Sequence, residues 1–360
     1  MRVLQIIASG DVGGGTNHVL QILRGLKDSM SLYLVTQRDS YLSRKAGEMG
    51  IPCVGLDFFS GRLDPRVPFR LQKVLRSVKP HVVHVHGGRA AFFQALAGNA
   101  VPSVYTVHGF HFAHKPFPFR WLAAGAERLA LNRANHVIFV SRFDQNLAKT
   151  YRLLSGNTPN CVIHNGIPCP SVTVGAQGRQ CLIGFVGRLE PPKDPLLFLD
   201  SLRELPHYRA VIIGAGSLEI TVQKEIARKG LADRVTMRGG LSHEETMNGM
   251  RDLHLLVMTS RWEGLPLVPL EAMRIGVPVV TTDVGGMREI IEDGKSGVLV
   301  PDRTSTAIAL AVKRVCEDER LRANLVNEAR KRVTEIFSEE TMLSRVREVY
   351  EGIARFGQTV

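Results

Sequence analysis

Short apolar runs of strand length recur along the whole chain, and segments of helix length separate them. The first run, residues 3–8, ends at the glycine-rich turn 10–15 and precedes a helical pattern of apolar residues. Further runs lie at residues 31–35, 82–85, 103–107 and 137–140. Strands that are apolar on both faces and alternate with helices form parallel sheets covered by helices. The first half is therefore predicted to be an α/β domain.

The same pattern starts again in the second half. After the turn-rich residues 166–178, apolar runs recur at residues 181–186, 210–213, 234–237, 253–258, 277–280 and 297–300. A chain of 360 residues is long for a single hydrophobic core. We therefore expect two successive domains, residues 1–168 and 169–337, with a hinge near residues 167–180. Residues 338–360 begin with an amphipathic helix that carries Leu343, Val346, Val349 and Tyr350.

Composition limits the possible classes of protein. The hydrophobic content of 44% is ordinary for a globular protein, and no apolar run approaches the ~20 residues that a membrane span needs. The N-terminal run is too short for a signal peptide, so we expect a cytoplasmic protein. The five cysteines are odd in number and contain no Cys-x-x-Cys pair, which predicts reduced, inert thiols rather than a disulfide framework or zinc site.

Two glutamates, Glu263 and Glu271, flank the start of a predicted helix. Gly264 and Pro266 interrupt any helix before them, and the apolar helical pattern ends at Gly276. Backbone N–H groups at a helix start attract phosphate, while carboxylates accept hydrogen bonds from hydroxyl groups. A nucleotide sugar offers both kinds of group. Two solvated charges beside an amphipathic helix would give the same short pattern.

Two glycine-containing loops follow predicted strands. Gly187 precedes Arg188 and Lys193 in a loop stiffened by prolines, and such a pair of cations suits a leaving diphosphate, although ordinary loop charges would look alike. Residues 13–15 are three glycines that would let a phosphate approach the backbone. They match neither the dinucleotide fingerprint nor a P-loop, so a plain turn fits them equally well.

Several histidines raise the question of a metal. His81, His84 and His86 lie in one segment, with His108 and His111 further on, but no carboxylate or cysteine accompanies them. The chain has no Asp-x-Asp that would hold magnesium on a nucleotide. We therefore expect no metal. His108 ends a buried strand, where a neutral imidazole could bind a sugar hydroxyl or play a merely structural role.

The excess of positive over negative charge is confined to the first half. Residues 1–170 contain 20 Lys and Arg against 8 Asp and Glu, whereas residues 171–360 contain 26 of each kind, which gives the net charge of +12. Residues 58–79 and 110–121 mix these cations with aromatic side chains, as surfaces that bind anionic membranes do. A solvated basic face is the other interpretation, and no nucleic-acid-binding signature is present.

Three segments together resemble the family 4 retaining glycosyltransferases. They are residues 185–194, 214–219 and 263–273, in the family's order and spacing, and residues 140–141 and 164–167 are also similar. The resemblance covers nearly the whole chain. It implies the α/β fold called GT-B, in which two Rossmann-like domains face each other across a cleft and a C-terminal helix crosses back to the first domain.

The resemblance also implies roles for single residues. Arg188 and Lys193 would hold the donor diphosphate, Glu271 the ribose hydroxyls, and Leu241 would lie against the base. Glu263 and the backbone of residues 264–268 would hold the transferred sugar and its phosphate. The catalytic residues would be His108, Arg188, Lys193 and Glu263; the donor-binding residues would be Gly14, Gly15, Gly216, Leu241, Gly264, Leu265, Leu267, Val268 and Glu271. Pro269 departs from the family pattern, but it stands early enough in the helix to be tolerated.

These observations predict a retaining transferase, hexosyl or N-acetylhexosaminyl, that needs no metal or other cofactor. It would move a sugar from a nucleotide diphosphate sugar, more readily UDP-linked, to a lipid-linked or membrane-proximal glycan acceptor in cell-surface polysaccharide synthesis. The basic half would lie on an anionic membrane, at the inner face of the plasma membrane. The rival interpretations are a nucleotide-sugar epimerase of the same architecture and a non-catalytic subunit that binds a sugar nucleotide.

Overall fold

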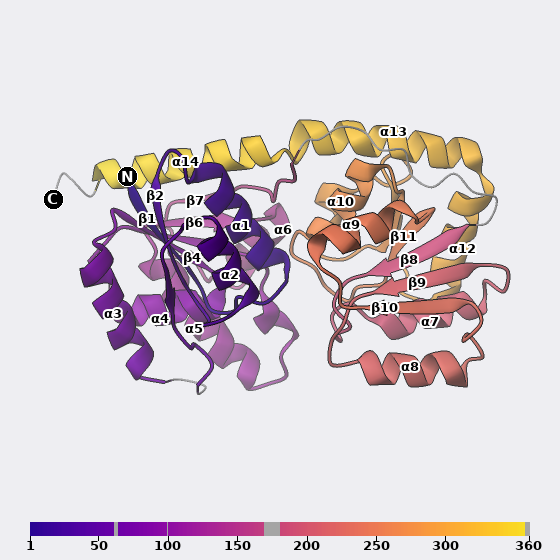
Figure 1. The fold of residues 1–360 in the computed structure, drawn as a ribbon, viewed down its shortest axis with the longest axis horizontal. Helices are drawn as coiled ribbons and strands as arrows, with labels where there is room; N and C mark the ends of the chain where they lie inside the picture. Colours follow the sequence, from indigo (N-terminus) through magenta and orange to yellow (C-terminus); the bar gives the residue numbers. More distant parts are fainter. Residues whose placement is uncertain (61–63, 99, 169–180, 357–360) are drawn as a thin grey trace. The chain divides into compact units, whose positions relative to one another are not determined.

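The computed structural model describes residues 1–60, 64–98, 100–168 and 181–356, which form two compact units (Figure 1). One unit comprises Met1–Asn165 and Glu339–Val360, and the other comprises Gly166–Ser338. Most of the predicted hinge lies outside the described residues, as do Arg62 and Cys169.

The first unit contains a parallel sheet with the order β3-β2-β1-β4-β5-β6-β7. Its strands are β1 (Arg2–Ile7), β2 (Ser31–Thr36), β3 (Cys53–Gly55), β4 (Val82–His86), β5 (Ser103–Val107), β6 (His136–Phe139) and β7 (Asn160–Val162). Its helices are α1 (Gly14–Leu26), α2 (Tyr41–Glu48), α3 (Arg66–Val78), α4 (Gly88–Ala97), the 3₁₀ turn η1 (His111–His114), α5 (Phe119–Arg133), α6 (Arg142–Thr150) and α14 (Glu339–Phe356).

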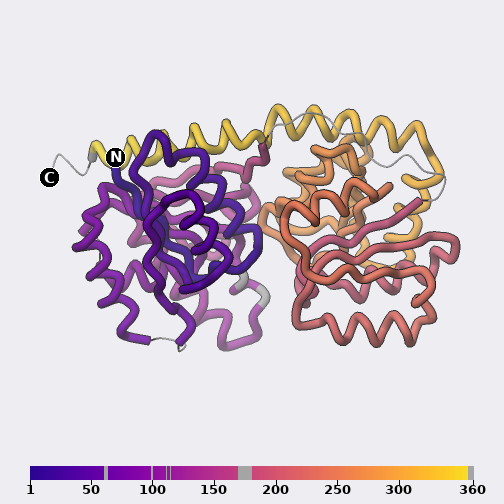
Figure 2. The backbone as a smooth tube through the Cα atoms, in the orientation of Figure 1, coloured from indigo at the N-terminus to yellow at the C-terminus, as the bar shows by residue number. Residues whose placement is uncertain are grey.

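Helices cover both faces of this sheet. On one face α3, α4 and α5 bury residues such as Leu71, Phe93 and Leu131. On the other, α1 and α2 pack with the C-terminal helix α14, whose Val346 and Tyr350 are fully buried. The backbone trace shows α14 running along the first unit, close to the N-terminus (Figure 2). The predicted amphipathic helix therefore completes the core of the first unit.

The second unit contains a parallel sheet with the order β10-β9-β8-β11-β12-β13. Its strands are β8 (Leu182–Val186), β9 (Arg209–Ile213), β10 (Val235–Gly239), β11 (Leu255–Met258), β12 (Val279–Thr282) and β13 (Val298–Val300). Its helices are α7 (Pro195–Arg203), α8 (Glu219–Arg228), α9 (His243–Arg251), α10 (Leu267–Ile275), α11 (Met287–Ile290), α12 (Ser305–Glu317) and α13 (Glu319–Ile336). Helices α7, α8 and α12 bury side chains such as Phe198, Val222 and Val312 in the core of this unit.

The strand order reverses once in each sheet, between β1 and β4 and between β8 and β11. Ligands of doubly wound α/β sheets bind beyond the carboxyl ends of the strands at such a reversal. The prediction of two α/β domains of parallel strands is thus confirmed, and the strand topology indicates where each domain would bind a ligand.

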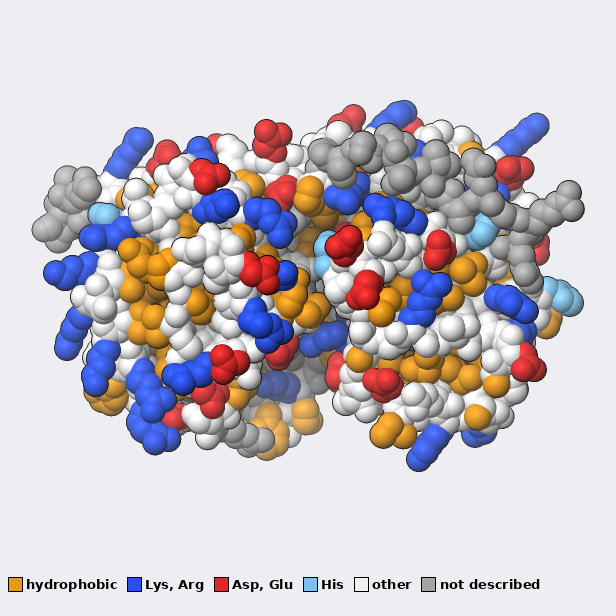
Figure 3. All heavy atoms as spheres, in the orientation of Figure 1, with side chains coloured by type: hydrophobic (Ala, Val, Ile, Leu, Met, Phe, Trp, Pro, Cys, Tyr) orange, Lys and Arg blue, Asp and Glu red, His pale blue; other side chains and the backbone are white. Residues whose placement is uncertain are grey.

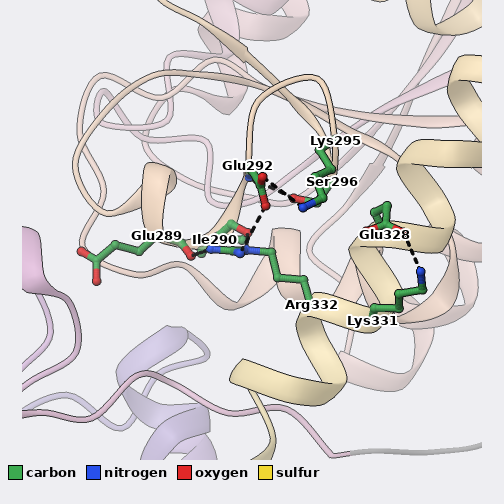
Figure 4. A network of polar contacts seen from close by, with 8 residues as sticks. All are labelled: Glu289, Ile290, Glu292, Lys295, Ser296, Glu328, Lys331 and Arg332. Carbon is green, nitrogen blue, oxygen red and sulfur yellow. Dashed lines mark hydrogen bonds and ion pairs between the residues drawn. The ribbon is translucent and has the colours of Figure 1, made fainter.

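Helix α13 is anchored by a polar network around Arg332 (Figure 4). The Arg332 guanidinium donates to the carbonyl oxygens of Ile290 at 2.7 Å and Glu289 at 2.8 Å, at the end of α11. It also lies 3.8 Å from the Glu292 carboxylate, while Ser296 accepts from the Glu292 N–H at 2.9 Å. These bonds satisfy carbonyls at a helix end and fix α13 to the loop before β13.

The prediction that all cysteines are reduced is wrong for one pair. Cys181 and Cys316 form a disulfide with their Cα atoms 6.3 Å apart, joining the start of β8 to the end of α12. The fold brings together two residues 135 positions apart, which an odd count and the missing Cys-x-x-Cys motif could not reveal. Cys53 and Cys161 are free thiols.

Across the described ranges, we find no helix that combines the length and the apolar character needed to cross a membrane.

Candidate functional site

The loop after β8 carries Arg188, which is exposed, and is packed against the glycine turn that follows β9. The Glu190 carboxylate accepts from the Ser217 N–H at 2.9 Å and from the Ser217 hydroxyl at 2.6 Å, and these bonds lower the pKa of Glu190. A Cβ added at Gly216 would lie 2.5 Å from the Leu189 carbonyl oxygen. Only glycine fits at position 216, so the two loops meet backbone to backbone.

Lys193 and Glu263 form an ion pair, which the sequence did not predict. Lys193 Nζ lies 2.5 Å from Glu263 Oε1, and the Ser260 hydroxyl donates to the same oxygen at 2.6 Å. The two charged side chains are 18% and 9% exposed, so water screens the pair only in part. The residues assigned to the diphosphate and to the sugar are therefore neighbours in the second unit.

Asp194 holds the Lys193 loop in place, and it too was missed by sequence reasoning. Its backbone is left-handed, with φ 50°, and its carboxylate accepts from Arg261 at 3.0 Å and Arg303 at 2.6 Å. The Thr259 hydroxyl donates to the Asp194 carbonyl at 2.8 Å. No local motif indicates this cluster, because Arg303 lies far along the chain and only the fold brings it close.

Glu271 lies in the second turn of α10, where its side chain is 11% exposed. Burial raises the pKa of Glu271 to about 7, while the charge of Arg274 acts in the opposite direction. His243 Nδ1 lies 3.8 Å from the carboxylate. Leu241, half-buried, stands two residues before His243 in the turn between β10 and α9. The residues predicted for the ribose and for the base thus lie near each other.

The start of α10 is shaped as predicted. The helix begins at Leu267, continues through Pro269 and ends at Gly276, which is left-handed with φ 84°. Leu265 and Leu267 are buried, so only their backbone could meet a ligand, whereas Val268 is half-buried. The Gly264 carbonyl accepts from the Gly286 N–H at 3.1 Å, and a Cβ added at Gly285 would overlap the Glu263 carbonyl oxygen.

In the first unit, the glycine turn and His108 lie together. Gly14 and Gly15 are the first residues of α1. A Cβ added at Gly15 would lie 3.7 Å from His108 Cδ2, in ordinary van der Waals contact. The glycine turn after β1 therefore packs on the histidine after β5, as ligand-binding loops at the carboxyl edge of a parallel sheet do.

A buried polar chain connects α14 to His108. Gln5 Nε2 donates to the Tyr350 hydroxyl at 2.9 Å, and Gln5 Oε1 accepts from His86 Nε2 at 2.8 Å. His86 Nδ1 then accepts from His108 Nε2 at 3.3 Å, and Tyr350 lies 2.5 Å from His84 Nδ1. Burial is the main cause that lowers the pKa of both His84 and His86, and the neighbouring histidines lower it further. With His86 neutral and the Gln5 amide so oriented, His86 carries its proton on Nε2, and its Nδ1 is the acceptor for His108 Nε2.

His18, on α1, is a further histidine of this group. Burial lowers the pKa of His18 to about 4, and the nearby Asn165 side chain raises it by a smaller amount. The His18 ring nitrogens have no hydrogen-bond partner at normal distance and angle among the described residues. One ring nitrogen from each of His18, His86 and His108 lies within 4.8 Å of the other two. Three imidazoles could hold a late transition metal. Within the described ranges this group includes no carboxylate or cysteine, and the expectation of no metal stays a prediction.

The predicted site residues thus form two groups. Gly14, Gly15 and His108 belong to the first unit, while Arg188, Lys193, Gly216, Leu241, the Glu263–Val268 segment and Glu271 belong to the second. The roles of these residues and the cleft between domains remain predictions.

The fold and the comparisons define the class. A chain with two Rossmann-like sheets and a C-terminal helix that returns to the first has the GT-B fold. Anabaena HepE in complex with UDP-glucose matches 98% of this chain over its whole length, with a TM-score of 0.84 and 21% identity.

The chain belongs to glycosyltransferase family 4. The family model described as Glycosyltransferase Family 4 matches residues 12–169, and that of Glycosyl transferases group 1 matches residues 173–332. An uncharacterized glycosyltransferase of Methanocaldococcus jannaschii is 26% identical over 355 residues, covering 95% of both chains. A lipopolysaccharide core biosynthesis mannosyltransferase of Rhizobium meliloti is 31% identical over 222 residues, covering 55% of this chain and 62% of that protein.

Proposed function

We propose that this protein is a retaining glycosyltransferase that moves a hexosyl or N-acetylhexosaminyl group from a UDP-sugar to a lipid-linked or membrane-proximal glycan in cell-surface polysaccharide synthesis. The observation that carries the proposal is the Lys193–Glu263 pair beside the start of α10. Two relatives support it: HepE has been crystallised with UDP-glucose, and the Rhizobium mannosyltransferase acts in lipopolysaccharide core biosynthesis.

The second unit would bind the donor. Arg188 and Lys193 would neutralise the diphosphate, and the backbone N–H groups of Leu267 and Val268 would donate to it, since Pro266 and Pro269 have none. Glu271 would accept from the ribose hydroxyls. Glu263 would face the transferred sugar when Lys193 turns to the diphosphate. Two cations and a helix start supply the positive charge that a leaving nucleoside diphosphate needs, and for this reason we propose that transfer requires no metal.

His108 and the leaving group would act on the sugar together. In the proposed reaction the acceptor oxygen forms a bond to the anomeric carbon on the face from which the diphosphate leaves. The anomeric C–O bond to phosphate breaks, and the acceptor proton passes to a phosphate oxygen. His108 would form a hydrogen bond with a sugar hydroxyl. The anomeric configuration is then retained without a covalent intermediate on a carboxylate.

The first unit would lie on an anionic membrane. The cations of α3 and of the residue that follows it (Arg66, Arg70, Lys73, Arg76 and Lys79) are all exposed. Near them Phe69 is 66% exposed, and at the start of α5 Phe117 is 76% and Trp121 58% exposed. Lys and Arg side chains also gather over α3 in Figure 3. Aromatic rings would enter the headgroup layer while the cations meet lipid phosphates, at the inner face of the plasma membrane.

The test is a transfer assay with UDP-sugars and a lipid extract, followed by NMR of the product. We expect the product to keep the anomeric configuration of the donor. An inverted product, or release of an epimer without any acceptor, would exclude the proposal. Binding to anionic liposomes should fall steeply with salt, and equal binding to neutral liposomes would exclude the membrane surface.

A further inference from the structure

An open groove of about 960 Å³ runs along β7, the edge strand of the first sheet. Its apolar lining includes Pro102, Ala134 and Ile163 from the sheet side, and Val349 and Ile353 from α14. His136 and Cys161 also line it, with His136 Nε2 3.3 Å from the Cys161 sulfur. A groove of this size can hold most of an extended hydrocarbon chain, and burying such a chain is favourable in proportion to its area.

A second, polar pocket of about 530 Å³ shares Arg345 with the groove. Arg142, Gln145 and Asn146, all from the first turns of α6, line it together with His164. Arg142 at the start of α6 and Arg345 from α14 would suit a phosphate, because a guanidinium can donate two parallel hydrogen bonds to phosphate oxygens.

The acidic residues nearby do not cancel this charge. Asp144 is buried, and its carboxylate accepts from the Ser141 hydroxyl at 2.6 Å and does not line the pocket. Glu348 lines the apolar groove but not the polar pocket. The charge of Arg345 also acts on Cys161, which lines the groove. Burial raises the pKa of the Cys161 thiol overall, and the positive charge of Arg345 opposes this shift.

We propose that the groove and the polar pocket are one binding site for a single-chain lipid phosphate, with its acyl or isoprenoid chain along β7 and its phosphate between Arg142 and Arg345. This inference rests on the proposed function, because such a molecule would be the lipid part of the acceptor. The apolar lining selects for the chain, and the arginines select for the phosphate over a neutral head.

The phosphate end lies on the side of the first unit that carries the histidine group. His164 lines the polar pocket and precedes Asn165 in the chain. The Asn165 side chain is close enough to His18 to raise its pKa slightly against the larger effect of burial. His18 in turn lies against His108, with ring centroids 4.9 Å apart. A glycan attached to the phosphate would therefore start at the carboxyl edge of the sheet, where the sugar is expected.

Gly352 on α14 gives a precise way to fill the groove. It lines the groove, and a Cβ added there would have no atom within 4 Å. Gly352→Leu should therefore occupy the groove without disturbing the core, and it also favours helix. Gly125→Leu is the matched control, because Gly125 is an exposed glycine on α5 with no atom within 4 Å of an added Cβ.

Arg345→Gln tests the phosphate end. Its control is Arg347→Gln on the same helix, because Arg347 is exposed, donates to Ser29 at 3.1 Å and does not line either pocket. The probe is farnesyl phosphate below its micelle concentration, compared with farnesol and inorganic phosphate by calorimetric titration of the full chain.

We expect farnesyl phosphate to bind at least ~10-fold more tightly than either fragment. Gly352→Leu and Arg345→Gln should each weaken it by ~10-fold or more, and the two controls should bind like the wild type. Equal binding of farnesol, or unchanged binding by Gly352→Leu, would overturn the inference.

Two further arms separate this inference from the proposed function and from the membrane surface. All four variants should bind UDP like the wild type, since they lie outside the second unit. If the wild type transfers sugar to a lipid extract but does not bind farnesyl phosphate, the groove proposal fails and the transferase proposal stands. Anionic vesicles should bind Gly352→Leu as well as the wild type, and a parallel loss would assign the groove to bulk phospholipid instead.

Discussion

Replacing Glu271 by Gln should stabilise the second unit while it weakens donor binding. Burial raises the pKa of this carboxyl from 4.5 to about 7, so between these values the folded state holds a proton that the unfolded state has lost. Stability therefore falls as pH rises through this window, by ~1.4 kcal/mol per pH unit and ~3 kcal/mol altogether. Glutamine has no charge to bury, so Glu271→Gln should recover about 3 kcal/mol at pH 8 and almost nothing at pH 4.5.

Calorimetric unfolding at pH 4.5, 6 and 8 measures this effect. For a unit of this size the gain at pH 8 corresponds to roughly 6–12 °C in Tm. The relevant transition is the one that UDP shifts in the wild type. Glu263→Gln is the matched control, because Glu263 is paired with Lys193 and its replacement should lower stability. If the stability gained by Glu271→Gln does not increase between pH 4.5 and pH 8, burial does not raise the pKa of Glu271 in the folded protein.

Four other outcomes are expected. UDP should bind the wild type up to ~10-fold more weakly at pH 6 than at pH 8, because the ionised Glu271 carboxylate accepts stronger hydrogen bonds from the ribose hydroxyls than the protonated carboxyl does, and titration at the two values checks this. Gly216→Ala should cost ~1–3 kcal/mol of stability and weaken UDP binding, because its Cβ would press on the Leu189 backbone; a variant as stable as the wild type speaks against the loop packing. Asp194→Asn keeps a residue that tolerates the left-handed backbone but loses the charge that binds Arg261 and Arg303, so turnover should fall while secondary structure by circular dichroism stays intact. Tyr350→Phe should lower the free energy of unfolding by ~1–3 kcal/mol and change the ¹⁵N signals that report the histidine tautomers. Unchanged signals would show that the Tyr350 hydroxyl does not influence the histidine group.

The central strands of both sheets follow from the sequence, but two edge strands do not. Interior strands such as β1, β5 and β8 are buried on both faces and therefore read as continuous apolar runs. β3 and β7 have three residues each and are half-buried or exposed, so neither shows a periodic pattern. β7 is the strand along which the groove runs, so the proposed lipid site could not be seen in the sequence.

The local parts of the site were predictable, while its long-range contacts were not. The start and end of α10 follow from the positions of Pro266 and Gly276, which act on their own neighbours. The contact of Lys193 with Glu263 and the position of Tyr350 beside Gln5 depend on sheet topology and on α14 returning to the first unit. The raised pKa of Glu271 could not be predicted either, because it is caused by burial, and burial depends on the whole fold.

Donor binding by the second unit is tested by a calorimetric screen of UDP-, GDP-, ADP- and dTDP-sugars against the wild type and Lys193→Ala. We expect saturable binding of a UDP-sugar that is strongly weakened in Lys193→Ala, with the same far-ultraviolet circular dichroism in both proteins. If no nucleotide sugar binds, or if the UDP-sugar binds Lys193→Ala as tightly as the wild type, the donor site assigned to the second unit is wrong.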